Sequence, residues 1–581
     1  MENMYYTNER NVQIVISLLK AYGIHRVIAS PGTTNMTFVG SIQHDPWFVV
    51  YSSVDERSAA YIACGLAEET GEPVVLSCTG ATASRNYMPG LTEAYYRKLP
   101  ILAITSHRGN EKIGHLIDQQ IDRRSLPNDI ARISVTVPHV HDVTEEQYCI
   151  IETSKAILEL FHRGGGPAHI NLLTKYSKDF SVKELPPVRV INRIKNSDDR
   201  PLLSKEDSVV IYIGSHKPFN EAETELIDEF CAVYNAFVIY DKTSGYKGKY
   251  GINFSLLGAQ KHDCFSKIKF DKLIHLGEVS GNSFGHAFNV KEVWRVNEDG
   301  ELRDTFGKLT YVFEQCEKDF FLSYIPKEYE INTSNYNYFK SEYQRVFSMI
   351  PELPFGNIWI AKTIHDKLPK GSELHVGIFN SLRSWDFFEI DKSIKSNCNV
   401  GGFGIDGALS TLVGASLVNS DKLYFGVFGD LAFFYDMNVL GNRHVGKNLR
   451  ILLINNGRGN EFRLSMHPCN IFGDDADKYM AAAGHYGNKS RNLVKHYSED
   501  LGFKYLTASN KEEFKTLMEI FLDPNITSSS ILFEVFTEME DERNALDVIM
   551  QTSESAKNKI KRTIADSSMG EVLKKIRDVL K

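Results

Sequence analysis

Apolar runs of strand length alternate with segments of helical periodicity along most of the chain. Residues 12–22, 56–69 and 82–99 carry apolar or small side chains at helical spacing. The strand-like runs between and around them are HRVIA (25–29), PVVLSCTG (73–80), PILAITSHRG (100–109) and PAHINLL (167–173). Strands that alternate with helices predict a parallel, doubly wound α/β sheet.

The same alternation starts again twice further along the chain. Residues 180–206 are rich in Lys, Asp, Pro and Ser, which predicts a linker. New α/β patterns begin at SVVIYIGS (208–215) and near Pro354. We therefore expect three doubly wound parallel-sheet domains and a helical tail, with the bounds 1–185, 205–335, 345–545 and 546–581. In the tail, Val572, Ile576, Val579 and Leu580 share one helical face, which suits docking on the body of the protein or on a partner subunit.

Two polar pairs follow neighbouring strand-like runs in the third α/β pattern. Leu423 to Phe428 stops at Gly429-Asp430, and Leu449 to Ile454 stops at Asn455-Asn456. Parallel strands joined by one helix end at the same edge of a sheet, where open α/β sheets bind ligands. Asp430 and Asn456 can then offer oxygens to one Mg²⁺, which completes its shell with water and phosphate. The pairing predicts a metal-bridged diphosphate, whereas a plain strand-to-helix turn would explain Gly-Asp alone.

Composition excludes several classes of protein. The 581 residues have a formal net charge of −8, with acids and bases mixed, and no basic stripe suits nucleic acid. No stretch approaches the roughly 18 apolar residues of a membrane span, and the polar start MENMYYTNER has no signal-peptide core. Eight cysteines without a CxxC pattern indicate a cytoplasmic protein with reduced thiols, against the alternative of a disulfide set or a zinc site.

Several short motifs together resemble a known family. They are SPG at 30–32, DERSAA at 55–60, TSHR at 105–108, FNS at 379–381, GIDG at 404–407 and GDL…YDMN at 429–438. With Asn455-Asn456 they are similar to thiamine-diphosphate-dependent enzymes of the pyruvate decarboxylase and acetolactate synthase branch. Within that branch the chain most resembles MenD-type synthases of 2-succinyl-5-enolpyruvyl-6-hydroxy-3-cyclohexene-1-carboxylate. The resemblance implies that the first domain binds the aminopyrimidine, that the third binds the diphosphate, and that Mg²⁺ is present.

The resemblance also assigns roles to individual residues. Glu56 would hydrogen-bond the pyrimidine N1′ and so promote cofactor activation. Without the other motifs, Glu56 would be interpreted only as an acid at the N-terminus of a helix, where the helix dipole favours it. Asp430, Asn456 and the main-chain oxygen of Arg458 would bind the metal. The residues implied in cofactor binding are Ser30, Gly32, Asn380, Ser381, Ile405, Gly429, Leu431, Ala432 and Phe462. Of these, Ile405 is the apolar wedge under the bent cofactor and Phe462 a second wall, roles that overlap with simple core packing.

The substrate side departs from the family pattern. Cations that bind substrate carboxylates in the family are replaced here by Thr34, Val400, Asn282 and Ser283. Pockets for dicarboxylates need fixed guanidinium partners, so the family's own substrate pair is disfavoured. The remaining substrate candidates are Thr33, Thr34, Arg108, Gln120 and Arg383. The stretch 460–492, which includes Met-His-Pro, is interpreted as a lid over the cofactor or as a surface loop.

These observations lead to one expected function and several rivals. We expect decarboxylation of a 2-oxo acid and transfer to a carbonyl or enone acceptor, with a sugar or nucleotide-sugar ketone as one candidate. The alternatives are a simple 2-oxo acid decarboxylase and a catalytically silent, thiamine-diphosphate-binding regulator. A nucleotide-binding transferase is disfavoured because no G-x-G-x-x-G or Walker motif follows a strand. The family layout implies a homodimer or tetramer with active sites between subunits.

Overall fold

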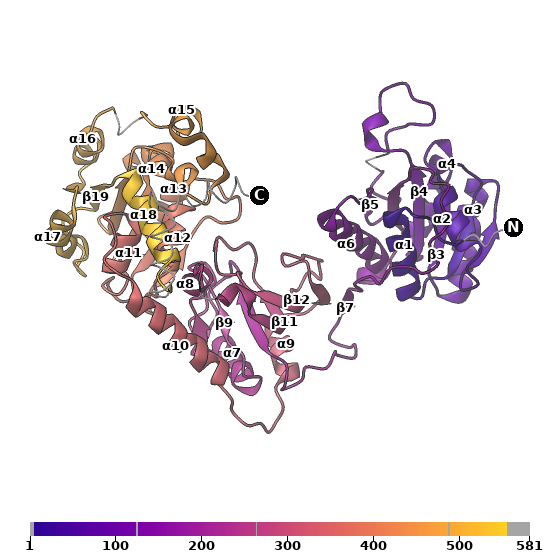
Figure 1. Cartoon of the computed structure of the whole chain (residues 1–581), viewed down its shortest axis with the longest axis horizontal. Helices are drawn as coiled ribbons and strands as arrows, with labels where there is room; N and C mark the ends of the chain where they lie inside the picture. Colours follow the sequence, from indigo (N-terminus) through magenta and orange to yellow (C-terminus); the bar gives the residue numbers. More distant parts are fainter. Residues whose placement is uncertain (1–4, 124–125, 263, 486–488, 555–581) are drawn as a thin grey trace, which may run out of the picture. The chain divides into compact units, whose positions relative to one another are not determined.

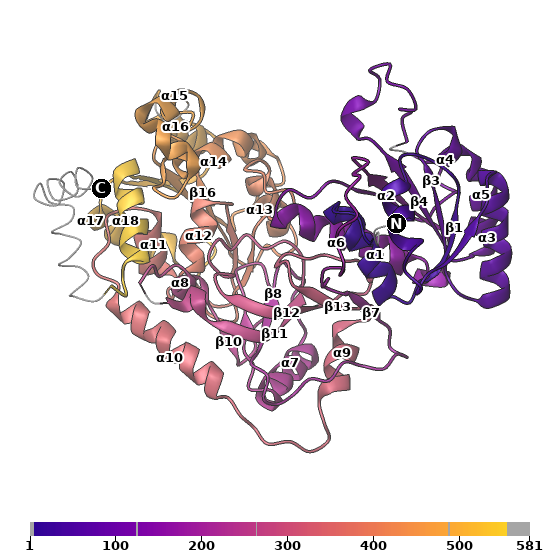
Figure 2. The same ribbon diagram turned by 45° about the vertical axis from the view of Figure 1, so that its right-hand side comes forward.

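The chain folds into three parallel sheets, as the alternating pattern predicted. The computed structural model describes residues 5–123, 126–262, 264–485 and 489–554. The sheets have six, seven and six strands, which confirms the predicted α/β class. The chain divides into two compact units, 1–199 with 298–314 and 200–297 with 315–581. The first sheet lies in the first unit and the third sheet in the second (Figures 1 and 2).

The first sheet is covered by helices on both faces. Its strands follow the order β2-β1-β3-β4-β6-β5, with bounds β1 (Arg26–Ala29), β2 (Val49–Ser52), β3 (Val74–Thr79), β4 (Ile101–His107), β5 (Ser134–Val137) and β6 (Ala168–Leu173). Side chains that alternate along β3 enter different cores, as the two-residue period of a strand requires. Val75 packs in the core with α1 (Arg10–Ala21) and α6 (Val143–Glu159). Leu76 packs in the core with α3 (Glu56–Thr70) and α5 (Met88–Arg97).

Local sequence signals explain how the helices near the first sheet begin. Asp55 is the N-cap of α3, and its carboxylate accepts hydrogen bonds from the backbone N–H groups of Arg57 and Ser58. The segment predicted as one helix, 82–99, forms α4 (Thr82–Asn86) and α5 instead. Pro89 lies in the first turn of α5, where a missing N–H costs no hydrogen bond.

The middle sheet continues the parallel pattern. In the second unit its strands run β10-β9-β8-β11-β12, with bounds β8 (Val209–Ile213), β9 (Val238–Ile239), β10 (Gly251–Ile252), β11 (Lys269–Leu276) and β12 (Asn289–Val296). In the first unit, β7 (Asn192–Ile194) pairs in parallel with β13 (Leu309–Phe313). The segment predicted as a linker therefore contains a short strand. Three β-branched residues, Val188, Val190 and Ile191, come just before this strand and favour extended structure.

The third sheet carries the two polar pairs. Its order is β15-β14-β16-β17-β19-β18, with bounds β14 (Glu373–Val376), β15 (Lys395–Asn397), β16 (Tyr424–Gly429), β17 (Leu449–Asn455), β18 (Lys504–Ala508) and β19 (Ile531–Phe536). One face packs against α13 (Ala408–Ser416) and α14 (Asp430–Asp436) in a continuous apolar core. Phe533 of β19 stacks on Phe514 of α17 (Lys511–Phe521), with ring centroids 5.2 Å apart. These buried faces fix the direction of the strands that end at the polar pairs.

The last helix of the described residues lies across the predicted C-terminal boundary. Helix α18 (Met539–Met550) crosses the predicted start of the tail at residue 546 and packs against α11 (Asn357–Ile364). The predicted apolar face at 572–580 lies outside the described residues. Among the described helices, none has both the length and the apolar character that crossing a membrane requires. The seven cysteines whose side chains are described are unpaired, and four of them are buried.

Candidate functional site

The register of two neighbouring strands brings the polar pairs together. β16 and β17 run in parallel, with Gly429 opposite Ile454. Asp430 therefore starts α14 beside the point where β17 ends at Asn455. Asp430 and Asn456 both line one cavity of about 360 Å³ at this edge of the sheet. The spatial pairing expected from the sequence is present, whereas the metal-binding role stays a prediction.

Asp430 is a buried acid surrounded by backbone donors. Its side chain accepts hydrogen bonds from the N–H groups of Leu431 at 2.7 Å and Gly457 at 2.6 Å. Burial nevertheless raises the pKa of the Asp430 carboxyl to about 7, because desolvation disfavours the charged form. A cation placed beside this carboxyl would compensate for the lost solvation of its negative charge.

The two asparagines of the pair have different surroundings. Asn455 is buried and donates a hydrogen bond to Glu534 at 2.7 Å, so it braces β17 against β19. Asn456 lies one residue further and lines the cavity. Its Oδ1 accepts a 3.3 Å hydrogen bond from the backbone N–H of Arg458. Asn456 is therefore the asparagine of the pair that a ligand in the cavity could contact.

The cavity gathers every cofactor and metal residue predicted for the third domain. These residues are Asn380, Ser381, Ile405, Gly429, Asp430, Leu431, Ala432, Asn456, Arg458 and Phe462. They lie in four separate segments of the chain, at or after the carboxyl ends of β14, β15, β16 and β17. The lining combines polar and apolar side chains, which suits a ligand with a charged end and an apolar ring.

Several lining residues were not predicted. Asn357, which begins α11, donates a 3.2 Å hydrogen bond to the Ser381 hydroxyl. His467 also lines the cavity, and its ring lies 5.2 Å from that of Phe462. The Cys469 N–H donates to His467 Nδ1 at 3.1 Å, so a neutral ring carries its hydrogen on Nε2. Met-His-Pro belongs to the stretch 460–492, for which the sequence predicts a lid over the cofactor or a surface loop, but nothing in that stretch singles out His467 as a lining residue.

A buried acid supports the start of helix α12 (Asn380–Asp386), which carries Asn380 and Ser381. Glu542 of α18 accepts from the Asn357 N–H at 3.0 Å, from the Thr537 hydroxyl at 3.0 Å and from Asn380 Nδ2 at 3.3 Å. Burial raises the pKa of Glu542 to about 7 despite these donors. One carboxyl group thereby joins α18 and α11 to a residue that lines the cavity.

Two phenylalanines line the cavity with strained backbones. Phe379 has φ of 62° and Phe403 has φ of 55°, in the region that favours glycine. Their rings meet edge to face with centroids 5.6 Å apart. Backbone strain of this kind costs about 1–3 kcal/mol per residue and persists where surrounding structure enforces it. The pair narrows the cavity with aromatic carbon where a small residue would leave space.

The cationic side chains near the cavity are already paired. Arg383 makes a two-pronged ion pair with Glu461, at 2.8 and 2.6 Å, and its side chain is 5% exposed. Glu461 lines the cavity and Arg383 does not. The Arg458 guanidinium is bound to Asp477. The guanidinium of Arg383 is therefore paired with Glu461 and does not line the cavity. The structure gives no support to its predicted role in substrate binding.

The predicted residues of the first domain form a separate group in the first unit. Ser30 and Gly32 follow β1, Glu56 follows β2, and Arg108 and Gln120 follow β4, all beyond the carboxyl ends of strands of the first sheet. Glu56 begins α3 and accepts a 3.2 Å hydrogen bond from Asn86 Nδ2.

The polar substrate candidates of this group have partners of their own. The Thr34 hydroxyl donates to the Ser106 carbonyl at 2.7 Å, while the neighbouring Thr33 is exposed. Arg108 contacts Asp118 at 3.2 Å and Tyr176 at 2.5 Å. Their substrate roles stay predictions.

The chemistry of the cavity fits a diphosphate cofactor with a divalent metal. Asp430 and Asn456 supply side-chain oxygens, and α14 presents backbone N–H groups at its start. Asn357 Oδ1 and both amide atoms of Asn460 line the same cavity and have no hydrogen-bond partner among the described residues. Buried polar atoms of this kind are normally satisfied, and a bound polar ligand would satisfy them.

Comparison with known proteins gives a consistent picture. Residues 10–126 match the family model described as "Thiamine pyrophosphate enzyme, N-terminal TPP binding domain". The chain is 31% identical to the 2-succinyl-5-enolpyruvyl-6-hydroxy-3-cyclohexene-1-carboxylate synthase of Bacteroides thetaiotaomicron, over 92% of this chain and 96% of that protein. Synthases with the same description from Bacteroides fragilis and Flavobacterium psychrophilum are 31% and 28% identical, each over 92% of this chain and 97% of the relative.

The Asp430→Asn substitution tests the metal-binding edge of the cavity. It keeps the shape of the side chain but removes the negative charge, so we expect at least about a tenfold loss of cofactor affinity in the presence of Mg²⁺. Asp421→Asn is the matched control, because Asp421 is exposed near the opposite end of β16. Isothermal titration with thiamine diphosphate measures both variants. Equal affinity of Asp430→Asn and the unaltered protein would contradict the assignment.

The Glu542→Gln substitution tests the buried acid under Asn380. The folded protein keeps the Glu542 proton up to about pH 7, whereas an unfolded glutamate loses it near pH 4.3. Folded protein then binds more protons between these values, so its stability falls as pH rises from 4.3 through 7. We expect the unaltered protein to lose roughly 1–3 kcal/mol more stability than Glu542→Gln between pH 5 and pH 8. Thermal unfolding at the two pH values measures this, and parallel pH profiles would sink the idea.

Proposed function

Because the chain belongs to the thiamine pyrophosphate enzyme family, we propose that it decarboxylates a 2-oxo acid and transfers the acyl unit to a carbonyl or enone acceptor. Thiamine diphosphate and Mg²⁺ are the proposed cofactors. Residues 1–185 would bind the pyrimidine, residues 345–545 the diphosphate, and residues 205–335 would form the central domain. The observation that carries the proposal is the single cavity that collects Asp430, Asn456 and Arg458.

Each part of the chain has a separate chemical task in this proposal. When bound, thiamine diphosphate supplies the electron sink that makes loss of CO₂ from a 2-oxo acid feasible. Asp430, Asn456 and the Arg458 carbonyl would hold the metal, and the N–H groups at the start of α14 would hold phosphate oxygens. Ile405 and Phe462 would pack against the apolar ring. Glu56, oriented by Asn86, would hydrogen-bond the pyrimidine.

His467 adds a proton-carrying group to the proposed site. Its Nδ1 is an acceptor for Cys469, so the Nε2 hydrogen is the one available at the cavity. A positioned imidazole can act as a general acid or a general base. His467 would thus serve either protonation of the product, as in a decarboxylase, or proton transfer at an acceptor carbonyl.

The named relatives favour carboligation over simple decarboxylation. Three relatives that match across nearly the whole chain are named as synthases of 2-succinyl-5-enolpyruvyl-6-hydroxy-3-cyclohexene-1-carboxylate, and none of the three is named as a decarboxylase. A simple 2-oxo acid decarboxylase uses the same cofactor residues and is the main alternative. A silent cofactor-binding regulator is the alternative of another class, and the presence of Glu56 beside Asn86 counts against it.

The cavity supports a substrate with less negative charge than the family's own. Glu461 places a carboxylate on the wall, and the neighbouring Arg383 is bound to it. Phe379 and Phe403 add an aromatic surface. Fixed guanidinium groups recognise substrate carboxylates, while a wall carboxylate accepts hydrogen bonds from hydroxyl groups. We therefore place a neutral or hydroxylated carbonyl compound, such as a sugar ketone, ahead of a dicarboxylate acceptor.

Assembly as a homodimer or tetramer is also part of the proposal. Exposed apolar side chains surround the start of α3, beside Glu56: Val54 is 78% exposed, Tyr61 48% and Ile62 47%. β2, the edge strand before α3, also exposes Val49, Val50 and Tyr51. Contiguous apolar surface of this kind commonly marks an interface between subunits.

The Glu56→Gln substitution tests the proposed activating acid. Gln keeps the size of the side chain but is a poor proton donor to a ring nitrogen, so turnover should fall by about 10²- to 10⁴-fold. Glu69→Gln on the exposed side of the same helix is the control and should keep full turnover. CO₂ release from the best 2-oxo acid measures both variants. Unchanged turnover of Glu56→Gln would remove its assigned role.

A panel of 2-oxo acids tests the proposed substrate class. Because no free guanidinium lines the cavity among the described residues, we expect kcat/KM for pyruvate to exceed that for 2-oxoglutarate by at least about tenfold. CO₂ release with thiamine diphosphate and Mg²⁺ present gives the ratio. Preference for 2-oxoglutarate would contradict the substrate class and leave the cofactor proposal intact.

A further inference from the structure

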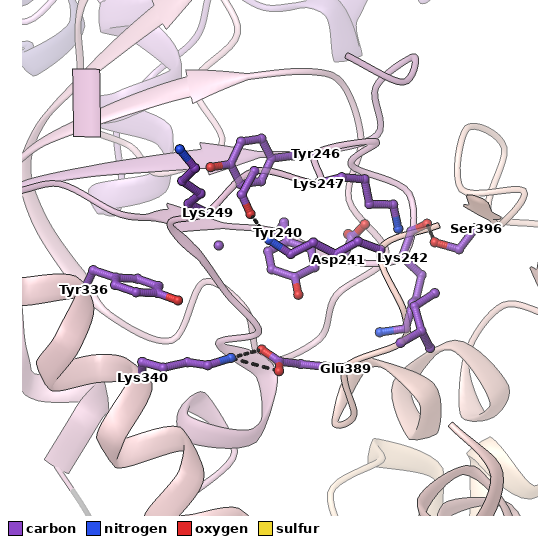
Figure 3. A pocket seen from close by; sticks show the side chains of 14 residues that line it. Tyr240, Asp241, Lys242, Tyr246, Lys247, Lys249, Tyr336, Lys340, Glu389 and Ser396 are labelled. Carbon is purple, nitrogen blue, oxygen red and sulfur yellow. Dashed lines mark hydrogen bonds and ion pairs between the residues drawn. The ribbon is translucent and has the colours of Figure 1, made fainter. Parts of the chain in front are cut away.

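A second cavity, unrelated to the cofactor residues, lies within the second unit. It has a volume of about 90 Å³ and shares no lining residue with the cofactor cavity. Its walls come from three parts of the chain: residues 240–251, which follow β9, residues 389–396, and helix α10 (Ser334–Met349), as Figure 3 shows. Five of its lining residues are lysines: Lys242, Lys247, Lys249, Lys340 and Lys392.

The two acids in this lysine cavity are already engaged. Both oxygens of Glu389 accept from Lys340, at 2.7 and 2.9 Å. Asp241 accepts from the Thr243 N–H at 2.6 Å and from the Ser280 hydroxyl at 2.5 Å. Of the five lysines, only Lys340 therefore has an acid of the cavity as its direct partner.

The remaining lysines keep unused donors. Lys242, whose side chain is 3% exposed, donates to the Phe388 carbonyl at 2.8 Å, and its ammonium nitrogen lies 4.0 Å from a carboxylate oxygen of Asp386, beyond hydrogen-bond distance. Lys392 donates to the Gly248 carbonyl at 2.6 Å. An ammonium group has three hydrogens, so each retains two. Lys247 makes no hydrogen bond or ion pair with any residue in the described part of the chain, and Figure 3 shows it beside the same cavity.

Lys247 shows the electrostatic consequence of this arrangement. Burial, followed by the ammonium groups of Lys242 and Lys392, lowers the pKa of Lys247 to about 8; Asp391 opposes the shift only partly. Like charges that are withdrawn from water repel one another, and a bound anion would relieve that repulsion. Lys249, which is exposed, adds a further positive charge at the rim.

The size and the donors of the cavity define the anion. A volume of about 90 Å³ admits a compact group and excludes a whole nucleotide. Separate ammonium groups suit a tetrahedral dianion, because lysine binds phosphate as a set of point charges. The phenols of Tyr240 and Tyr336 add two hydrogen-bond donors to the lining.

We propose that this lysine cavity binds a phosphate dianion, either free or as the terminal monoester of a small metabolite. The site is separate from the diphosphate site, so its occupant is a ligand additional to the cofactor. Lys242 also connects the cavity to α12 (Asn380–Asp386), because its backbone N–H donates to Asp386 at 3.2 Å. That helix begins with Asn380 and Ser381, which line the cofactor cavity.

Isothermal titration at pH 7 tests the site on the full chain saturated with thiamine diphosphate and Mg²⁺. Inorganic phosphate and glycerol 3-phosphate are titrated separately, with acetate as a singly charged control. We expect one equivalent of a phosphate ligand to bind. The ligand with the higher affinity shows whether the site takes free phosphate or a phosphate monoester. No binding of either ligand, or equal binding of acetate, would overturn the proposal.

The Lys247→Met substitution shows whether any binding occurs in the lysine cavity. We expect at least about a tenfold weaker affinity for phosphate, because one of the few ammonium donors is lost. Lys318→Met, on the exposed side of α9 (Glu317–Tyr324), is the matched control and should bind normally. Lys392→Gln, at an exposed position, gives a second test if Lys247→Met folds poorly. Unchanged phosphate affinity in a folded variant of either lysine would overturn the proposal.

Discussion

The parallel register of β16 and β17 is the constraint on which the rest of the site depends. It places Asp430 beside Asn456, although 25 residues separate them in the chain. The apolar core around α13 and α14 holds both strands in that register. A shift by one residue would turn every side chain of a strand to the opposite face. The core thus determines that the Asp430 carboxylate and the Asn456 side-chain amide lie close together. The proposed metal and diphosphate site depends on that proximity.

At the carboxyl edge of the third sheet, the residues proposed to bind the cofactor and those proposed to face a substrate lie on different kinds of structure. Residues that would bind diphosphate and metal lie at the ends of strands and at the start of α14, positions set by the sheet. Residues that would face a substrate, such as Phe403 and Glu461, lie on loops and a 3₁₀ turn beyond the sheet. Loops change side chains without disturbing the core, so one scaffold can keep its cofactor chemistry while its substrate changes.

Much of the fold and the cofactor edge could be predicted because the signals are local. The apolar runs that became β3, β4, β16 and β17, and the polar pairs after them, are visible in short windows of sequence. Glu542 and Asn357 escaped prediction because their contact joins residues 185 positions apart. The Arg383–Glu461 pair escaped for the same reason, since each residue alone suggests only a charged side chain. The lysine cavity combines five lysines from three segments of the chain, and no spacing in the sequence predicts that they lie together.

A crystal structure of the protein with thiamine diphosphate and Mn²⁺ in place of Mg²⁺ would show whether Asp430 and Asn456 bind the metal, because anomalous scattering locates it. We expect one metal peak within about 2.0–2.3 Å of side-chain oxygens of both Asp430 and Asn456, with the diphosphate on its other side. A metal bound elsewhere, or a diphosphate seated away from the start of α14, would contradict it.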